Sequence, residues 1–293
     1  MNDYLIRVIS NQSNVRGLAC ITTELAKKAS AIQKTTPTPS AALSRALTGV
    51  SLMGALLKKN QRVVLRFDGN GPMQKMAVES NGSGAVRGYV GVPNAELPLK
   101  NGKVDVAGAI GRAGLLTVTR DIGLKEPYTS TVHLVSGEIG EDLAYYFTAS
   151  EQVPSAVGVG SFVEPDGRIT AAGGFLIQAL PDADPTAIDG IVERIRYMRS
   201  ITEQIRDGAT PEQFIDELFD SVQYQILQKI PLAYSCSCSR QRVEKGLLSI
   251  GKDQLRSLKQ EKDPVSAECE FCHQRYEFSD EDIQELIDTL SRK

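Results

Sequence analysis

Ser235-Cys236-Ser237-Cys238-Ser239 and, further along the chain, Cys269-Glu270-Phe271-Cys272 contain four of its five cysteines. Two tight pairs of thiols separated by about thirty residues are a typical ligand set for one tetrahedral zinc ion. A disulfide between Cys236 and Cys238 would close a strained ring, since bonded cysteines usually have Cα atoms about 4.4–6.8 Å apart and a dihedral angle near about 90°. Such a bond is comparatively easy to reduce. The sequence therefore predicts a zinc site at Cys236, Cys238, Cys269 and Cys272 that can also respond to an oxidant.

The composition indicates a globular protein. With 293 residues, of which 41% are hydrophobic and 24% charged, the chain is long enough for one large and one small domain. The net charge of −3 gives no global electrostatic case for binding to nucleic acid or to an anionic membrane. Residues 1–7 contain no basic segment followed by an apolar one, and no stretch approaches the roughly 18 apolar residues of a transmembrane helix. We therefore expect a cytoplasmic protein, in a compartment where thiols stay reduced.

The four cysteines lie in a C-terminal segment, residues 232–293, that has few apolar residues for its length. A unit this small usually needs an additional constraint, and zinc would supply it. A capping signal at residues 279–282 predicts a final helix. His273 follows Cys272 directly, but four thiolates already complete a tetrahedron, so we interpret His273 as a surface residue. Three cations near the first pair either favour the thiolate form or make up an ordinary solvated helix face: Arg240, Arg242 and Lys245.

Residues 181–231 are interpreted as an amphipathic helical linker. From Asp184-Pro185 onward, apolar residues recur every three or four positions, which predicts one helix that ends at Gly208. Thr210-Pro211-Glu212-Gln213 has the form of a capping box and predicts the start of a second helix. The apolar stripe of these helices must pack against another surface. It consists of Ile188, Ile191, Ile195, Met198, Ile201, Ile205, Phe214, Ile215, Leu218, Phe219 and Val222.

Residues 1–180 are predicted to form a β-rich α+β domain with an antiparallel sheet and packed helices. Hairpin signals such as Asn81-Gly82-Ser83-Gly84 outnumber the spacings expected for parallel βαβ units. Thr38-Pro39 predicts the start of a helix rich in alanine and glycine, which should be packed closely on several sides. A further helix is expected over residues 141–152. The predicted strands are residues 4–9, 15–22, 62–67, 73–80, 85–92, 115–120, 129–135 and 174–179.

Signals of an enzyme are weak, and no catalytic residue is predicted. The chain contains two histidines, which leaves few positions for a Ser-His-Asp or Cys-His site. His133 is expected to be a packed or hydrogen-bonded sheet residue, and Cys20 a small buried hydrophobe. Three glycines are spaced like part of a phosphate loop but lack its Lys-Ser/Thr pair, so we interpret them as turns: Gly108, Gly111 and Gly114.

The cysteine pattern resembles that of a known family. Tyr234-Ser235-Cys236-Ser237-Cys238-Ser239-Arg240, followed by Cys269-Glu270-Phe271-Cys272-His273-Gln274-Arg275-Tyr276-Glu277-Phe278, is similar to the redox-switch zinc domain of the bacterial 33 kDa chaperonin family. The resemblance covers essentially the whole chain. It extends upstream through Gly114-Leu115-Leu116-Thr117-Val118-Thr119-Arg120-Asp121, Glu151-Gln152-Val153-Pro154-Ser155-Ala156-Val157-Gly158 and Ala172-Gly173-Gly174-Phe175-Leu176-Ile177-Gln178.

This resemblance implies a redox-regulated holdase, a chaperone that works without ATP. It implies that the four cysteines bind one zinc ion when reduced, and that oxidant and unfolding conditions release the ion. Disulfides Cys236–Cys238 and Cys269–Cys272 then form, the linker unfolds, and the protein dimerises and holds unfolding clients, with no role for nucleic acid or membrane. Tyr234 stands where an aromatic residue, often Phe, is expected. The candidate client-binding residues are Ile188, Ile191, Ile195, Met198, Ile201, Ile205, Phe214, Leu218 and Phe219.

Two alternatives come from other classes of protein. A zinc-ribbon module for nucleic acid predicts salt-dependent binding of RNA or DNA by the reduced, zinc-loaded form. A thiol–disulfide oxidoreductase would use the Cys269-x-x-Cys272 motif catalytically. That motif would normally lie at the start of a helix after a strand, and the sequence around it does not have this pattern.

Overall fold

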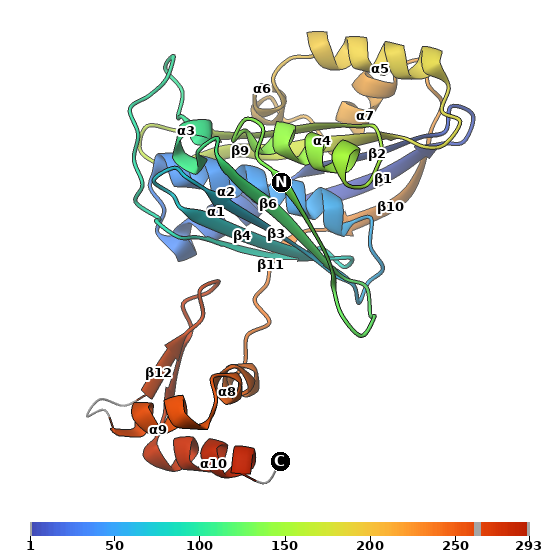
Figure 1. The fold of residues 1–293 in the computed structure, drawn as a ribbon. Coiled ribbons are helices and arrows are strands. Elements are labelled where there is room, and N and C mark those ends of the chain that lie inside the picture. Colours follow the sequence, from blue (N-terminus) through green and yellow to red (C-terminus); the bar gives the residue numbers. More distant parts are fainter. Residues whose placement is uncertain (1, 261–264, 292–293) are drawn as a thin grey trace. The chain divides into compact units, whose positions relative to one another are not determined.

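The computed structural model describes residues 2–260 and 265–291, and the chain divides into two compact units (Figure 1). The larger unit is Met1–Ser235, and the smaller is Cys236–Lys293. Residues 181–231, interpreted above as a linker, pack within the larger unit. In the described part of the chain, no helix combines the length and the apolar character needed to cross a membrane.

Two β-sheets form the framework of the larger unit, as the hairpin signals predict. All their strand pairs are antiparallel except the short parallel pair of β11 with β5. The five-stranded sheet has the order β10 (Gln225–Pro231), β1 (Tyr4–Ser10), β2 (Val15–Ile21), β9 (Ile169–Ala179) and β8 (Ser155–Val163). The six-stranded sheet has the order β11 (Ala233–Tyr234), β5 (Ala85–Val90), β4 (Lys75–Asn81), β3 (Arg62–Gly69), β6 (Gly114–Asp121) and β7 (Tyr128–His133).

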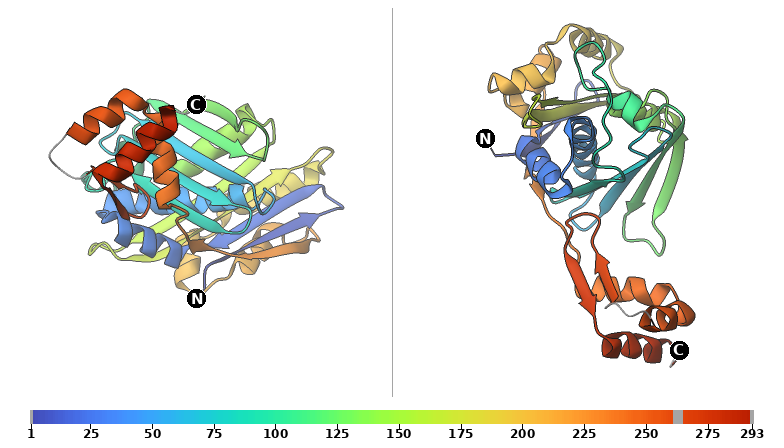
Figure 2. Two further views of the ribbon diagram at one scale, coloured as in Figure 1. Left: turned by 90° about the horizontal axis from the view of Figure 1, so that it is seen from below. Right: turned by 90° about the vertical axis from the view of Figure 1, so that its left-hand side faces the viewer.

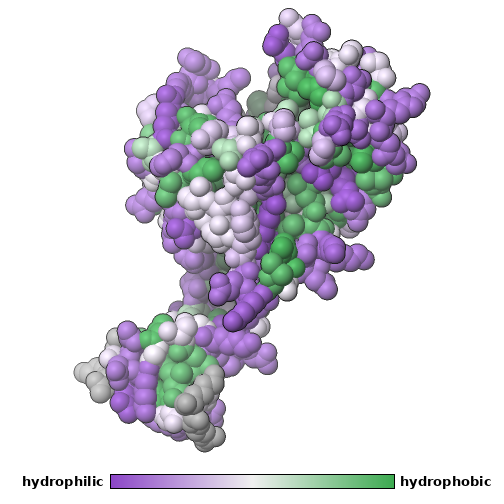
Figure 3. Space-filling view, turned by 45° about the vertical axis from the view of Figure 1, so that its right-hand side comes forward, coloured by the Kyte–Doolittle hydropathy of each residue, from purple (hydrophilic) through white to green (hydrophobic). Residues whose placement is uncertain are grey.

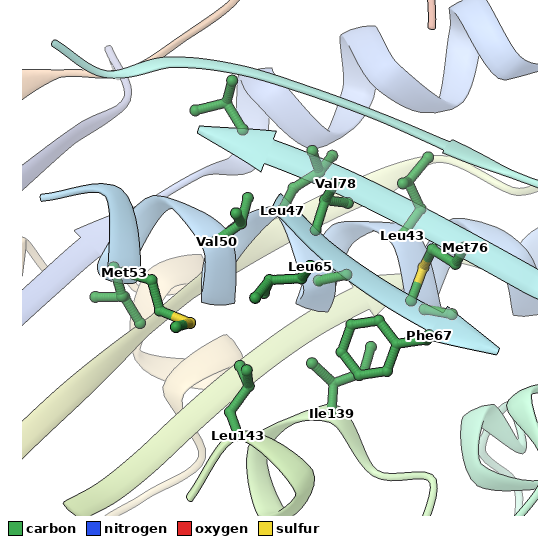
Figure 4. Close-up of a cluster of buried hydrophobic side chains, with 14 of the residues drawn as sticks. Leu43, Leu47, Val50, Met53, Leu65, Phe67, Met76, Val78, Ile139 and Leu143 are labelled. Carbon is green, nitrogen blue, oxygen red and sulfur yellow. The ribbon is translucent and has the colours of Figure 1, made fainter. Parts of the chain in front are cut away.

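Helix α2 (Pro37–Gly54) lies between the two sheets (Figures 1 and 2). Leu43, Leu47 and Val50 are fully buried among side chains of both sheets and of α4 (Figure 4). The predicted close packing on several sides is confirmed, because strands lie on two sides of the helix and its small residues let them approach. The helix begins at Pro37, two residues before Pro39, the residue that the sequence signal places at its first position.

Five elements of this unit are absent from the sequence-based prediction: α1 (Thr23–Gln33), α3 (Val106–Ile110), β8, β10 and β11. Helix α1 has no side-chain cap of its own. The Asp3 carboxylate accepts hydrogen bonds from the backbone N–H groups of Glu24 and Leu25 at 3.2 and 2.6 Å instead. A cap supplied from a distant residue leaves no local signal. The predicted helix over 141–152 is α4 (Ile139–Ala149).

Helices α5 (Pro185–Tyr197), α6 (Ile201–Arg206) and α7 (Pro211–Phe219) cover the outer face of the five-stranded sheet (Figure 1). The prediction of one helix ending at Gly208 is wrong, since Met198 has an extended backbone with φ −63° and ψ 146°. The break lets α5 pack on α7 while α6 packs on β8 and β9. The predicted capping box at Thr210 and Gln213 is confirmed.

Over residues 236–260 and 265–291, the smaller unit consists of three helices and a β-hairpin. These elements are α8 (Arg240–Ser249), α9 (Lys252–Gln260), β12 (Val265–Glu268), β13 (Arg275–Phe278) and α10 (Asp280–Ser291). Ser279 and Asp282 exchange hydrogen bonds at the start of α10, as the capping signal predicts. The described core is small, with only Leu255, Phe278, Ile283 and Ile287 buried at its centre. A core of this size leaves the unit dependent on another source of stability.

Candidate metal centre

The smaller unit brings the four predicted cysteines together. Cys236 and Cys238 lie in the segment before α8, whereas Cys269 and Cys272 lie in the loop between β12 and β13. This loop is fixed by two backbone hydrogen bonds, from His273 N to Cys269 O at 2.8 Å and from Cys269 N to Gln274 O at 3.1 Å. His273 has a positive φ of 56°, which reverses the chain after the second thiol.

The spacing of the sulfur atoms suits a metal ion. All four Sγ atoms lie within 4.8 Å of one another. Cys236 Sγ lies 3.7 Å from Cys269 Sγ, and Cys238 Sγ lies 3.3 Å from Cys272 Sγ. Four sulfurs that bind zinc at about 2.3 Å in a tetrahedron lie about 3.8 Å apart. The four thiols therefore fit a tetrahedral Zn²⁺ ion, and soft sulfur donors select such a metal over Mg²⁺ or Ca²⁺.

The two thiols of the hairpin loop, Cys269 and Cys272, resist ionisation. Burial, followed by hydrogen bonding with the neighbouring thiols, raises the pKa of Cys272 to about 12. Burial also raises the pKa of Cys269. Thiolates so close together repel one another, and a divalent cation supplies the opposing charge that makes their ionised forms stable. The electrostatics of the cluster thus agree with the spacing of its sulfur atoms.

Tyr276 is part of this site, and no sequence pattern indicated that role. Its hydroxyl donates a hydrogen bond to Cys238 Sγ at 3.1 Å, which raises the pKa of Tyr276 to about 12. Tyr276 lies on β13, in the alternating sequence after Cys272, so the hairpin aims its side chain back at the thiols. A donor of this kind orients a metal ligand and reduces the charge on it.

The cations near the first thiol pair bind other partners. Arg240 donates to Glu277 O at 2.7 Å, pairs with Asp282 at 2.8 Å and lies over the ring of Phe278. Arg242 donates to Ser237 Oγ at 2.5 Å. Both arginines therefore join α8 to its surroundings. Lys245 lines a groove between α8 and α10.

The side chains of the other residues singled out in the sequence are not part of the four-thiol cluster. His273 Nδ1 contacts Glu268 at 2.5 Å, as a surface residue does. Cys20 is fully buried in β2, and burial raises its pKa, which agrees with a structural role. His133 is a sheet residue, as expected, paired with Leu115 on the edge strand β7, but its side chain is exposed rather than packed. Gly108 lies inside α3, and Gly111, with φ 90°, ends that helix.

The nine candidate client-binding residues pack against one face of the five-stranded sheet. Phe214, Leu218 and Phe219 are fully buried and Ile191 is almost so. The remaining candidates are half-buried on the edge of the same cluster: Ile188, Ile195, Met198, Ile201 and Ile205. The sheet contributes Ile6, Val8, Val15, Ala19, Ile21, Phe175 and Ile177. The apolar stripe and the sheet therefore bury each other.

A two-sheet α+β unit followed by a small unit that holds four thiols defines a modular protein with a candidate metal centre at its C-terminal end. The chain matches the model of the Hsp33 protein family over residues 3–279. It therefore belongs to the Hsp33 family.

Several relatives, each matched over nearly its whole length, are named 33 kDa chaperonin. The 33 kDa chaperonin of Geobacter sulfurreducens is 54% identical over 291 residues, covering 99% of this chain and 97% of that protein. The 33 kDa chaperonin of Desulfotalea psychrophila is 50% identical, with 99% of both chains covered. A crystal structure of the 33 kDa chaperonin of Thermotoga maritima superposes with a TM-score of 0.89 at 34% identity, covering 100% of both chains.

Proposed function

We propose that this protein is a redox-regulated holdase that works without ATP. The observation that carries the proposal is the approach of four thiols, from two segments distant in sequence, to within 4.8 Å of one another. In the reduced state, Cys236, Cys238, Cys269 and Cys272 would hold one zinc ion. Zinc supplies the charge that keeps the four sulfurs ionised and together.

Oxidation of the thiols would remove much of the stability of the smaller unit. Binding of a structural zinc ion contributes on the order of 10–16 kcal/mol to the folding of small peptides. The few buried residues around Leu255 and Phe278 cannot replace a term of that size. We propose that disulfides Cys236–Cys238 and Cys269–Cys272 form as the ion leaves. In the reduced cluster Cys236 Sγ contacts Cys269 Sγ and Cys238 Sγ contacts Cys272 Sγ, so these disulfides would join thiols across those contacts rather than along them.

The client-binding surface would be the apolar stripe of α5–α7 and the sheet face beneath it. An apolar surface of this extent is a binding site for other apolar surfaces once it is exposed. We propose that α5 and α6 separate first, because most of their stripe residues are only half-buried, whereas the face of α7 is fully buried. The activated form would be a homodimer that holds unfolding proteins in the cytoplasm.

This function acts by binding rather than by catalysis. An oxidoreductase would place its Cys-x-x-Cys motif at the start of a helix, whereas Cys269 and Cys272 lie in a hairpin loop between β12 and β13. No specific observation favours a nucleic-acid-binding zinc ribbon.

Light scattering of a thermally unfolding reporter protein tests the proposal, with zinc release followed in the same samples. We expect peroxide-treated, zinc-free protein to suppress aggregation and the reduced protein to do so poorly. Cys272→Ser should bind zinc weakly and expose the smaller unit to protease, whereas the control His273→Asn should keep both properties unchanged. Equal suppression by the reduced and oxidised forms would contradict the proposal.

A further inference from the structure

β10 forms one edge of the five-stranded sheet with little of its side-chain surface buried. Ile230 is its one buried residue, whereas Ile226 and Leu227 are 51% and 45% exposed. Its register on β1 shifts between Arg7 and Val8. Within the described part of the chain, β10 packs mainly on β1. Backbone pairing, rather than side-chain packing, therefore accounts for most of its attachment.

β1 does not depend on β10 for its own position. Leu5, Ile6 and Val8 are fully buried, and all seven residues of the strand pair with β2. The opposite edge of the same sheet is different, because β8 packs against α2, α4 and α6. β10 is thus the edge strand that can leave while the other four strands stay in place. Its departure would present the backbone N–H and C=O groups of β1 to a new partner.

A small junction joins β10 to the linker helices. Lys229 Nζ on β10 pairs with Glu212 at 3.1 Å and lies 3.9 Å from the ring centroid of Tyr4. The Tyr4 hydroxyl donates to the same Glu212 carboxylate at 2.5 Å. Because Glu212 is in the first turn of α7, movement of that helix removes one of the two partners that hold Lys229 against the sheet.

β10 lies in the chain between two segments that the proposed switch would loosen. Helix α7 precedes it, and β11 follows it, with Tyr234 only two positions before Cys236. Ala233 N donates to Gly84 O and Leu232 N donates to Asp3 O, both at 3.0 Å. Once α7 and the thiol centre are released, the strand is held by its backbone pairing with β1 and by these bonds of the residues that follow it.

We propose that the edge of β1 vacated by β10 is a binding site for an extended segment of an unfolding polypeptide, which joins the sheet as a new strand. This inference rests on the holdase function proposed above. The present occupant indicates the kind of ligand, because β10 is held largely through its backbone and buries few side chains. Strand addition of this kind recognises main-chain groups and tolerates many sequences, as a chaperone for diverse clients requires. Apolar side chains of the added strand would reach the sheet face beside it, which carries Ile6 and Val8 of β1. Figure 3 shows apolar (green) residues among hydrophilic (purple) ones on the surface of the larger unit.

The experiment uses the full-length protein, activated with peroxide and heat, and two matched probes. One is a soluble peptide of alternating apolar and polar residues, and the other is the same peptide with N-methyl groups on alternate backbone nitrogens. We expect the N-methylated peptide to bind about tenfold more weakly, because it cannot donate the hydrogen bonds that join it to β1. Hydrogen exchange should show β10 unprotected in the activated protein, and β1 protected again when the unmodified peptide is added.

Three results would overturn the inference. The first is equal binding of both peptides, and the second is continued protection of β10 in the activated protein. The third is reprotection of β1 that depends on protein concentration rather than on peptide, because a second copy of the chain would then fill the edge. In each case the activated protein can still suppress aggregation of the reporter, so the holdase function would stand. Loss of that suppression is the separate result that contradicts the function itself.

Discussion

Individual polar residues in this protein act by capping elements distant in sequence. Asp3 is almost completely buried, and its carboxylate caps α1 through two backbone N–H groups. Burial is the main cause that raises the pKa of Asp3 to about 6. The two hydrogen bonds oppose this shift, but they do not cancel the cost of holding a charge away from water.

Asp3 should therefore make the stability of the larger unit depend on pH. The folded protein binds this proton at a higher pH than the unfolded chain does, so stability increases as the pH falls from 7 through 6 toward 4. Relative to Asp3→Asn, the wild-type free energy of unfolding should increase by up to about 3 kcal/mol over this range.

Denaturant unfolding of both proteins at several pH values measures this difference. Both proteins carry the same thiols, so acid release of metal affects them equally and cancels. A difference that stays constant from pH 7 to pH 4 would show that Asp3 does not titrate as described.

The single residues of the site were predictable to different degrees. The four cysteines carry their own signal, since paired thiols at ligand spacing are rare in other contexts. Tyr276 was not predictable, because its role depends on how the β12–β13 hairpin turns its side chain toward Cys238. The cap from Asp3 was missed for the same reason, since it joins residues 3 and 25 only in the folded chain.

Among the helices that cover the five-stranded sheet, α7 has the most completely buried apolar face. Its apolar face, with Phe214 and Phe219, is completely buried. Phe219 lies against Gly17 of β2, where an added Cβ would stand 3.0 Å from the aromatic ring and 2.9 Å from Val8 Cγ2. The absence of a side chain at Gly17 therefore allows the helix to approach the sheet closely.

Gly17→Ala should loosen α7 without touching the thiols. The new methyl group is closer to Phe219 than van der Waals contact allows, so we expect a loss of about 1–3 kcal/mol from overpacking. In the reduced state, the variant should show faster hydrogen exchange in α7 and should suppress reporter aggregation better than wild type.

Gly190→Ala is the matched control. Its Cβ would meet only the mobile end of Arg194 at 3.0 Å, on the helix α5. Zinc content should be unchanged in both variants. If hydrogen exchange in α7 is as slow in Gly17→Ala as in wild type, the sheet accommodates the methyl group and the prediction is wrong.

Regular elements with strong periodicity were predicted well, and those held by tertiary contacts were not. Strands β3, β4, β5 and β6 of the six-stranded sheet lie close to their predicted ranges, and β3 and β5 show a clear alternation of buried and less buried side chains. The break at Met198 and the strand β10 were missed, because the stripe of 188–205 has uninterrupted helical spacing and β10 has little buried surface to give a pattern. Contacts with the five-stranded sheet determine both where the helix breaks and where β10 pairs.

At the scale of the whole molecule, the two units differ in what holds them together. The larger unit has an extensive core that contains residues of both sheets, whereas the smaller unit has four central buried residues among those described. Stability that depends on a bound ion is lost when the ion is removed. The arrangement of α2 between two sheets could not be predicted from local patterns, because it depends on contacts among strands from every part of the larger unit.

Removal of metal under reducing conditions should therefore unfold the smaller unit and leave the larger one folded. We expect limited proteolysis after chelation to cut within Cys236–Lys293 and to spare the strands of both sheets. Restoring zinc should restore resistance, whereas magnesium should not, because thiolates bind it poorly. Unchanged resistance of the smaller unit after complete chelation would mean that its small core suffices.

The strand order of the five-stranded sheet also has a consequence for how the protein is made. β1 and β2 leave the ribosome first, but their neighbours β9 and β10 come from residues 169–179 and 225–231. The N-terminal hairpin and the apolar helix α2 must therefore wait for most of the chain to be synthesised before they can be buried. Folds with such distant pairings form slowly and expose apolar surface while they do so. During its own synthesis, this protein is itself the kind of chain that a holdase protects.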